Sequence, residues 1–110
     1  MKRLILVALI CFTSLTTFSQ ITVTHYNAGW NSANEVEWVE KLSDCDIAYV
    51  DVAKSPDLQK KHNVVVIPTI IVFQDGEEIK RFQADLSFKM AATKKEVQDF
   101  IDELIMSDFL

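Results

Sequence analysis

One stretch of the sequence, TIIVFQDGEEIKRF at 69–82, restricts the possible folds more than any other. Asp75-Gly76 lies between two runs of strand-forming residues, and this dipeptide favours a type I′ turn because both positions need a positive φ. The stretch therefore predicts an antiparallel hairpin. Residues 69–73 are almost wholly apolar, so the first strand of the hairpin should be covered on both faces.

The segments before the hairpin predict strands and helices in alternation. Residues 21–27 and 46–53 are rich in β-branched and aromatic types, which favour strands. Between them, Ser32 and Glu35 have the spacing of a capping box and predict a helix over 33–43.

Two more helices are predicted. Ser55-Pro56-Asp57 has a capping serine before a proline at the first helical position, and Asn63 is a plausible left-handed stop. A second capping box at 93–96 opens the last helix. Residues 84–92 are predicted to be a loop in which Phe88 and Met90 fold back on the core. The buried stripe of the last helix is predicted to contain Val97, Phe100, Ile101, Leu104 and Ile105.

The resulting order, β-α-β-α-β-β-α, predicts an α/β fold. Two strands joined through a helix should be parallel with a right-handed crossover, whereas the later hairpin is antiparallel. We therefore expect a mixed four-stranded sheet between two layers of helices, that is, a three-layer α/β/α architecture.

The first residues have the layout of a secretory signal peptide. Lys2 and Arg3 precede an apolar run over 4–12, and Thr17 and Ser19 stand before a possible cleavage point. The run is shorter than the ~20 residues of a spanning helix, although retention as an anchor stays an alternative. Ile10 before Cys11 disfavours lipid attachment, which usually needs a small residue there.

The expected division is therefore a signal peptide over 1–19 and one domain over 20–110. The domain is expected to be exported, to a bacterial periplasm or beyond the cell, with no membrane association after cleavage. The chain has a net charge of −5, and loss of Lys2 and Arg3 would make it more negative. Nucleic acid is therefore a poor candidate partner. Of the two cysteines, only Cys45 would remain, so no internal disulfide could form.

Three segments give the sequence its likeness to a known family. They are HYNAGWNSAN at 25–34, VDVAKSPDLQKKHNV at 50–64 and VVIPTIIVFQDGEEIKRF at 65–82. With Trp30 in register, they make residues 21 to about 106 resemble the thioredoxin family, although the strand and helix that usually precede them in members are not seen. The resemblance implies a minimal thioredoxin-like fold and a cis bond before Pro68.

The chain departs from that family at the positions that carry its chemistry. The two catalytic cysteines fall on Asn31 and Asn34, the residues between them on Ser32 and Ala33, and a buried acid on His25. Dithiol exchange needs a thiolate that attacks a disulfide, and an amide cannot ionise to supply one. We therefore expect no catalytic residue and no thioredoxin-type oxidoreductase activity from this degenerate site.

The resemblance still implies a groove for an extended peptide, which would meet the backbone of the residue before the proline. A redox-inactive accessory or chaperone-like module that binds a peptide or protein is the first hypothesis; the partner and the oligomeric state stay open. The predicted groove consists of Trp30, Asn31, Asn34, Ile67, Pro68 and Thr69.

Two other hypotheses stay open. Cys45 could be a reactive thiol of a monothiol redox protein, although Asp44 and Asp46 would disfavour its thiolate. The exposed edge of strand 46–53 could instead join a larger assembly. The two histidines have no spacing typical of a metal site, and no cofactor is expected.

Overall fold

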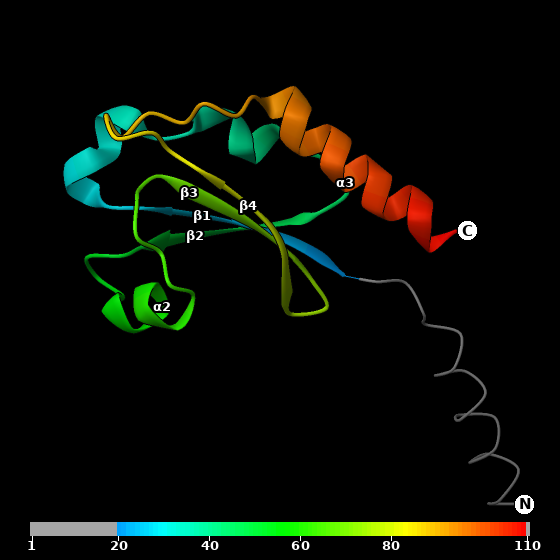
Figure 1. Ribbon diagram of the computed structural model, residues 1–110, viewed down its shortest axis with the longest axis horizontal. Coiled ribbons are helices and arrows are strands. Elements are labelled where there is room, and N and C mark those ends of the chain that lie inside the picture. The colour runs from blue at the N-terminus through cyan, green and yellow to red at the C-terminus, as the bar shows by residue number, and fades with distance from the viewer. Residues whose placement is uncertain (1–19, 110) are drawn as a thin grey trace, which may run out of the picture.

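The computed structural model describes residues 20–109, so the predicted signal peptide lies outside the described residues. Figure 1 shows one sheet between two layers of helices. The predicted three-layer α/β architecture with four strands is confirmed. The strands are β1 (Ile21–Asn27), β2 (Asp46–Asp51), β3 (Thr69–Gln74) and β4 (Glu77–Gln83).

The sheet is mixed, as the element order predicts. Its strand order is β2-β1-β3-β4. β1 runs parallel to β2 and antiparallel to β3, and β3 and β4 form the predicted hairpin. Asp75 has φ 52° and Gly76 has φ 86°, so both turn residues have the positive φ that a type I′ turn requires. The pairing register shifts where Val72 faces Lys80 and Phe73 faces Glu78, which leaves Ile79 unpaired and places a bulge in β4 that the sequence pattern did not indicate.

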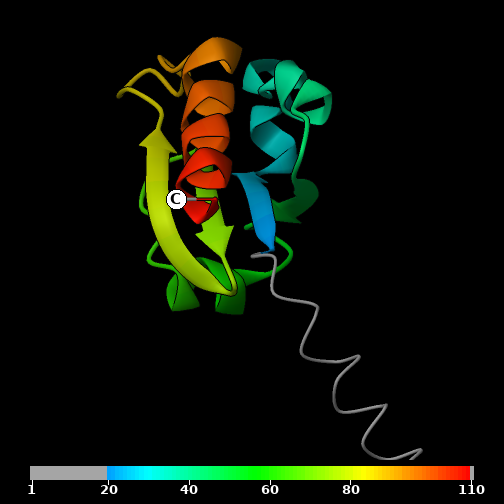
Figure 2. The same cartoon turned by 90° about the vertical axis from the view of Figure 1, so that its right-hand side faces the viewer.

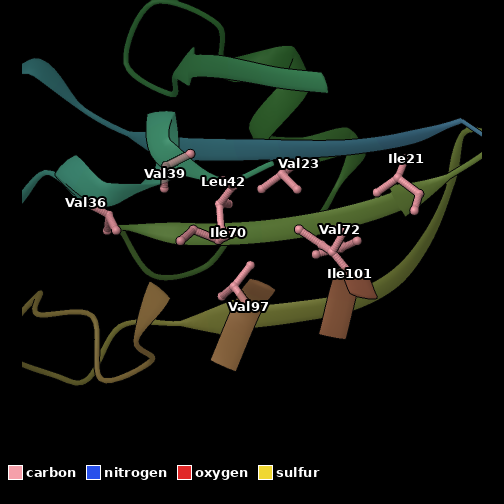
Figure 3. Packing of buried hydrophobic residues seen from close by; sticks show 9 residues of the cluster. All are labelled: Ile21, Val23, Val36, Val39, Leu42, Ile70, Val72, Val97 and Ile101. Atoms are coloured by element: carbon pink, nitrogen blue, oxygen red, sulfur yellow. The ribbon is translucent and has the colours of Figure 1, made fainter. Parts of the chain in front are cut away.

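One face of the sheet is covered by α3 (Lys94–Asp108) and by two short 3₁₀ helices, η1 (Gly29–Asn34) and η2 (Glu37–Lys41). Figure 2 shows α3 beside the 3₁₀ helices on this face. Side chains from β1, β3, α3 and the η2 region point toward one another and form the larger core cluster (Figure 3). Its buried members are Ile21, Val23, Val36, Val39, Leu42, Ile70, Val72, Val97 and Ile101.

The other face carries α2 (Pro56–Lys61) and a smaller core cluster. α2 has no buried residue of its own, so the segments on either side of it supply much of the apolar cover. The buried members of this cluster are Tyr26, Ala28, Val52, Val64, Ile67, Ile71 and Phe73.

The predicted helix over 33–43 is wrong. The chain forms η1 and η2 instead, and Glu35 and Val36 between them have extended backbones with ψ of 141° and 92°. The capping box therefore does not form. The N–H of Val36 donates to Nε2 of the buried His25 over 3.2 Å, so a long-range contact has replaced the local helical bond.

The ends of three other elements can be compared with their predictions. β2 ends at Asp51 rather than at residue 53, and Ser55 precedes α2 but its side chain makes no capping bond. Asn63, predicted as a left-handed stop, has φ 51°. At α3 one half of the predicted capping box forms, because Glu96 N–H donates to Thr93 Oγ1 over 3.2 Å. The Glu96 carboxylate accepts from the Thr93 hydroxyl over 3.4 Å, in place of the Thr93 N–H that the full box would use.

Candidate functional site

A cavity of about 370 Å³ opens between η1, the start of α2 and the two long loops of the chain. Most of its walls are apolar, and Gln59 and Asp85 are the polar side chains among them. Such a lining suits an apolar side chain of a ligand better than a charged one. The residues that line it are Trp30, Val52, Ala53, Gln59, Val65, Val66, Ile67, Asp85, Leu86 and Phe88.

Trp30 and Phe88 form one wall of this cavity. The two rings meet edge to face, with centroids 5.7 Å apart and planes at 89°. Trp30 is 69% exposed and Phe88 is 41% exposed, so the pair keeps a large apolar surface in contact with water. Phe88, which was expected to fold back on the core, therefore packs on Trp30 at the rim of the site.

A tight turn centred on Asp85 holds Phe88 in this place. The Asp85 carboxylate accepts hydrogen bonds from Ser87 N–H over 2.8 Å, from Ser87 Oγ over 2.6 Å and from Lys89 N–H over 3.2 Å. These bonds, the one from the Ser87 hydroxyl above all, lower the pKa of Asp85. The turn leaves Leu86 96% exposed at its tip and gives Phe88 a φ of 65°.

The segment before β3 forms the wall opposite Trp30. The bond between Ile67 and Pro68 is cis. Thr69 Oγ1 donates to Val66 C=O over 2.6 Å, which ties the segment to β3. Within residues 20–109, neither the N–H nor the C=O of Ile67 makes a hydrogen bond. Ile67 is 6% exposed and lines the cavity, so its two unpaired backbone groups lie in a residue of the cavity wall.

Three asparagines occupy the region where the resemblance places the thiols. Asn31 is buried, and its Nδ2 donates to Asn27 Oδ1 over 3.0 Å. Asn34 Nδ2 in turn donates to Asn31 Oδ1 over 2.9 Å, and Asn27 Nδ2 donates to Asn31 C=O over 3.3 Å. The amides thus form a connected chain of hydrogen bonds that satisfies Asn31 and holds η1 against the end of β1.

η1 also lacks the geometry of a long helix start. It is a 3₁₀ helix of six residues in which Asn31, with φ −111° and ψ 22°, is non-helical. The aligned peptide dipoles that stabilise a thiolate at an α-helix N-terminus are therefore weak here. Residues 31–34 hold no cysteine, so neither the residue types nor this geometry offers a thiolate at the site.

His25 lies beneath the link between η1 and η2. It is 2% exposed, and its Nε2 accepts from Val36 N–H. A ring nitrogen that accepts a hydrogen bond carries no proton, so His25 is neutral in this arrangement. Burial lowers the pKa of His25, and nearby Glu35 opposes this shift.

Cys45 lies at the opposite end of β2 from the cavity. It is half-buried and packs against the larger core cluster. Burial raises the pKa of the Cys45 thiol, and Asp46 and Asp44 raise it further. The environment therefore favours an unreactive thiol, which is the behaviour that the flanking aspartates predict.

The structure brings together only part of the predicted groove. Trp30 and Ile67 line the same cavity, whereas Asn34 lines a separate hollow with Trp38 and Met90. Asn31, Pro68 and Thr69 are buried. Val65 and Leu86 line the cavity although the sequence did not predict them as groove residues, and the one signal for Leu86 is an apolar residue inside a polar turn.

Residues 20–109 contain no group of three or more histidine, cysteine, aspartate or glutamate side chains placed to hold a metal ion. Within the same range, no helix combines the length and the apolar character needed to cross a bilayer.

Comparison with known proteins decides the family. The sequence model of the thioredoxin family matches residues 20–103, which is most of the chain. The chain belongs to the thioredoxin family. The resemblance stated from the sequence is thereby confirmed.

The sequence identity to individual thioredoxins is modest. The thioredoxin of Mycobacterium tuberculosis (strain H37Rv) is 34% identical over 65 residues, which cover 59% of this chain and 54% of that protein. The chain thus spans about half the length of this relative. Thioredoxin H2 of Arabidopsis thaliana is 25% identical over 99 residues, which cover 84% of this chain and 69% of that protein.

Solved thioredoxins confirm the fold. A mutant thioredoxin from Halobacterium salinarum NRC-1 superposes with a TM-score of 0.62 at 21% identity, covering 76% of this chain and 74% of that chain. Thioredoxin 1 from Thermosipho africanus TCF52B gives a TM-score of 0.61 at 20% identity, with 81% of this chain and 99% of that chain covered. At these identities, the likeness shows a thioredoxin fold and no more.

Proposed function

We propose that the protein is an exported thioredoxin-like domain that binds an extended, apolar peptide segment and carries out no dithiol exchange. The observation that carries this proposal is the position of the apolar cavity. It lies between Trp30 and Ile67, beside the asparagines that stand where the family has thiols.

The chemistry of residues 31–34 supports the loss of redox activity. A mixed disulfide needs a sulfur atom at the site, and Asn31 and Asn34 offer only amide groups that already bond to each other. Cys45 cannot take over at this site because it lies at the far end of β2, and its environment disfavours the thiolate.

The surface around the cavity supports peptide binding. Trp30, Val65 and Leu86 are 69%, 71% and 96% exposed, which concentrates apolar side chains at one opening. The unpaired backbone of Ile67 could add main-chain hydrogen bonds to a ligand, while the cavity takes one of its side chains. The pattern of Lys2, Arg3 and the apolar run after them supports export.

Binding is tested with a different protein that cannot refold. The probe is fluorescently labelled, reduced and carboxymethylated α-lactalbumin, and the measurement is fluorescence anisotropy during titration with the protein. We expect saturable binding that Leu86→Asp weakens by at least about tenfold, because a carboxylate would then stand at the apolar opening.

Met106→Asp is the matched control, because Met106 is a 64% exposed apolar residue on α3. It should leave the affinity within about twofold of wild type. No binding by the wild type, or equal weakening by both substitutions, would reject the cavity as the site.

The redox part has a separate test. The rate at which dithiothreitol reduces the insulin disulfides, followed as free A and B chains by chromatography, should be the same with wild type, with Cys45→Ser and with no protein added. A faster reaction with wild type than with Cys45→Ser would instead support the monothiol hypothesis.

A further inference from the structure

β2 is an edge strand of the sheet, and its outer side carries backbone groups that no other strand of residues 20–109 pairs with. β2 is the first strand in the order β2-β1-β3-β4, and within residues 20–109 it pairs with β1 alone. Beyond the strand, Val52 N–H donates to Asn27 C=O of β1 over 2.8 Å. Because backbone groups alternate sides along a strand, Val50 also faces β1, whereas Ile47 and Tyr49 direct their N–H and C=O groups outward.

Acidic residues border this edge. Between residues 35 and 51 the sequence holds six acidic residues and one basic residue, Lys41. Glu35, Glu37 and Glu40 line an open hollow of about 480 Å³ beside Tyr49. The ion pairs found within residues 20–109 join Arg81 to Glu78 and Lys95 to Asp99, so no carboxylate of this border forms an ion pair in that range.

Tyr49 offers a contact surface in the middle of the edge. It is 54% exposed, and its ring meets the ring of the buried His25 edge to face, with centroids 5.7 Å apart. This contact fixes one side of the ring while the other stays in solvent. An aromatic face among carboxylates is a favourable environment for a lysine or arginine side chain.

We propose that the outer edge of β2 is a second binding surface, which takes up an extended, basic segment of a partner protein as an added strand. The unpaired groups of Ile47 and Tyr49 would supply main-chain hydrogen bonds. The acidic border would select the charge of the segment.

The same charges argue against a second copy of this chain as the occupant. Pairing between two β2 edges would bring two acidic borders together, and each chain has a net charge of −5. Like charges at such an edge are a known means of preventing self-association. The acidic border attracts a basic segment of another protein, whereas it repels a second copy of this chain.

Three peptides test the proposal by nitrogen-15 NMR titration of the full chain. The probe is acetyl-KVTVKVTVK-amide, in which the valines and threonines favour a strand and three lysines supply the positive charge. The second peptide, acetyl-EVTVEVTVE-amide, reverses the charge. The third, acetyl-KVTVKPPVK-amide, keeps the charge but cannot pair as a strand across its centre.

We expect the probe to bind and to shift the amide signals of Ile47 and Tyr49 more than that of Ile67. The charge-reversed and proline peptides should each bind at least about tenfold more weakly. The proposal is overturned by no binding of the probe, by equal binding of the proline peptide, or by shifts centred on Ile67.

Two matched variants locate the charge effect. Glu37→Lys/Glu40→Lys reverses two exposed charges next to the edge and should weaken probe binding at least about tenfold. Glu77→Lys/Glu103→Lys makes the same charge change at exposed positions on β4 and α3, and should change the affinity by no more than about twofold. Equal weakening by both pairs would mean that the probe responds only to net charge, and would overturn the proposal.

Leu86→Asp distinguishes binding at β2 from binding in the cavity, since it should leave the affinity of the probe for β2 unchanged. Light scattering after size-exclusion chromatography should give the mass of a monomer. A dimer that dissociates in Tyr49→Lys would identify a second copy as the occupant and overturn the choice of a basic partner.

Discussion

The ring of Phe88 stands perpendicular to the indole of Trp30, with 5.7 Å between the ring centroids. This contact joins η1 to the loop between β4 and α3, so the two segments that build this wall of the cavity depend on each other. The contact also requires a left-handed backbone at Phe88, whose φ of 65° is costly for any residue with a Cβ atom.

Two substitutions of Phe88 separate the ring from the backbone. Phe88→Ala and Phe88→Gly both remove the aromatic contact, but glycine adopts the left-handed region without the steric penalty. We expect Phe88→Gly to be more stable than Phe88→Ala by about 1 kcal/mol in urea unfolding. An alanine variant as stable as the glycine variant would show that the turn at Asp85 does not hold this backbone conformation.

The amide chain at residues 27–34 gives a second prediction. Asn31→Ala leaves Asn27 Oδ1 and Asn34 Nδ2 without their partner, and should lower the free energy of unfolding by about 2 kcal/mol. Asn34→Ala removes only the outer bond of a half-buried side chain, and should cost at most about 1 kcal/mol. Equal losses of the free energy of unfolding in urea would contradict the role of Asn31 as the middle member of the amide chain.

His25 predicts how stability changes with pH. Burial lowers its pKa below 6.5 in the folded chain, so below that pH the unfolded chain binds protons more readily than the folded chain. The contribution of His25 is therefore complete above pH 6.5, and is lost as the pH falls toward the lowered value. Urea unfolding at a series of pH values should show stability falling through this range.

His25→Gln tests the assignment, since a glutamine oxygen can accept the Val36 N–H bond without titrating. We expect this variant to lose most of the pH dependence that wild type shows below pH 6.5. A variant that keeps the dependence of wild type would contradict the assignment to His25.

Cys45 should react slowly with iodoacetamide. Burial raises its pKa, so little thiolate is present near neutral pH. The control is a peptide of residues 43–48, which keeps both flanking aspartates but lacks the burial. Alkylation of the native protein at pH 7 should be slower than that of the peptide, and the rate should rise with pH. A fast reaction that does not change with pH would indicate a low-pKa thiol and revive the monothiol hypothesis.

The sequence predicted the sheet more accurately than the site, and particular residues explain why. Asp75-Gly76 and the apolar run before it are local signals, and the hairpin formed where they indicate. Ser32 and Glu35 are also a local signal, yet the helix did not form. Contacts outside the capping pattern decided that region: the bond from Val36 back to His25 in β1, and the amide chain that ends at Asn27.

The cavity was even harder to predict from the sequence than the region over 33–43. Its walls come from η1, α2 and two loops, and no short pattern in the sequence joins Trp30 to Leu86 or Val65. The resemblance to thioredoxins brought Trp30 and Ile67 together correctly. It could not supply Phe88, because that contact depends on the turn at Asp85.

The sheet divides the core into two clusters, and the smaller one is closed by a six-residue helix that buries none of its own side chains. Local unfolding of α2 alone would expose little apolar surface, so α2 can open by local fluctuation while Val64 and Ile67 stay packed in the smaller cluster. Amide hydrogens of α2 should therefore exchange with solvent well before those of β3. For the proposed peptide, the part of the cavity wall that carries Gln59 would then adjust to side chains of different size, at little cost to the rest of the domain.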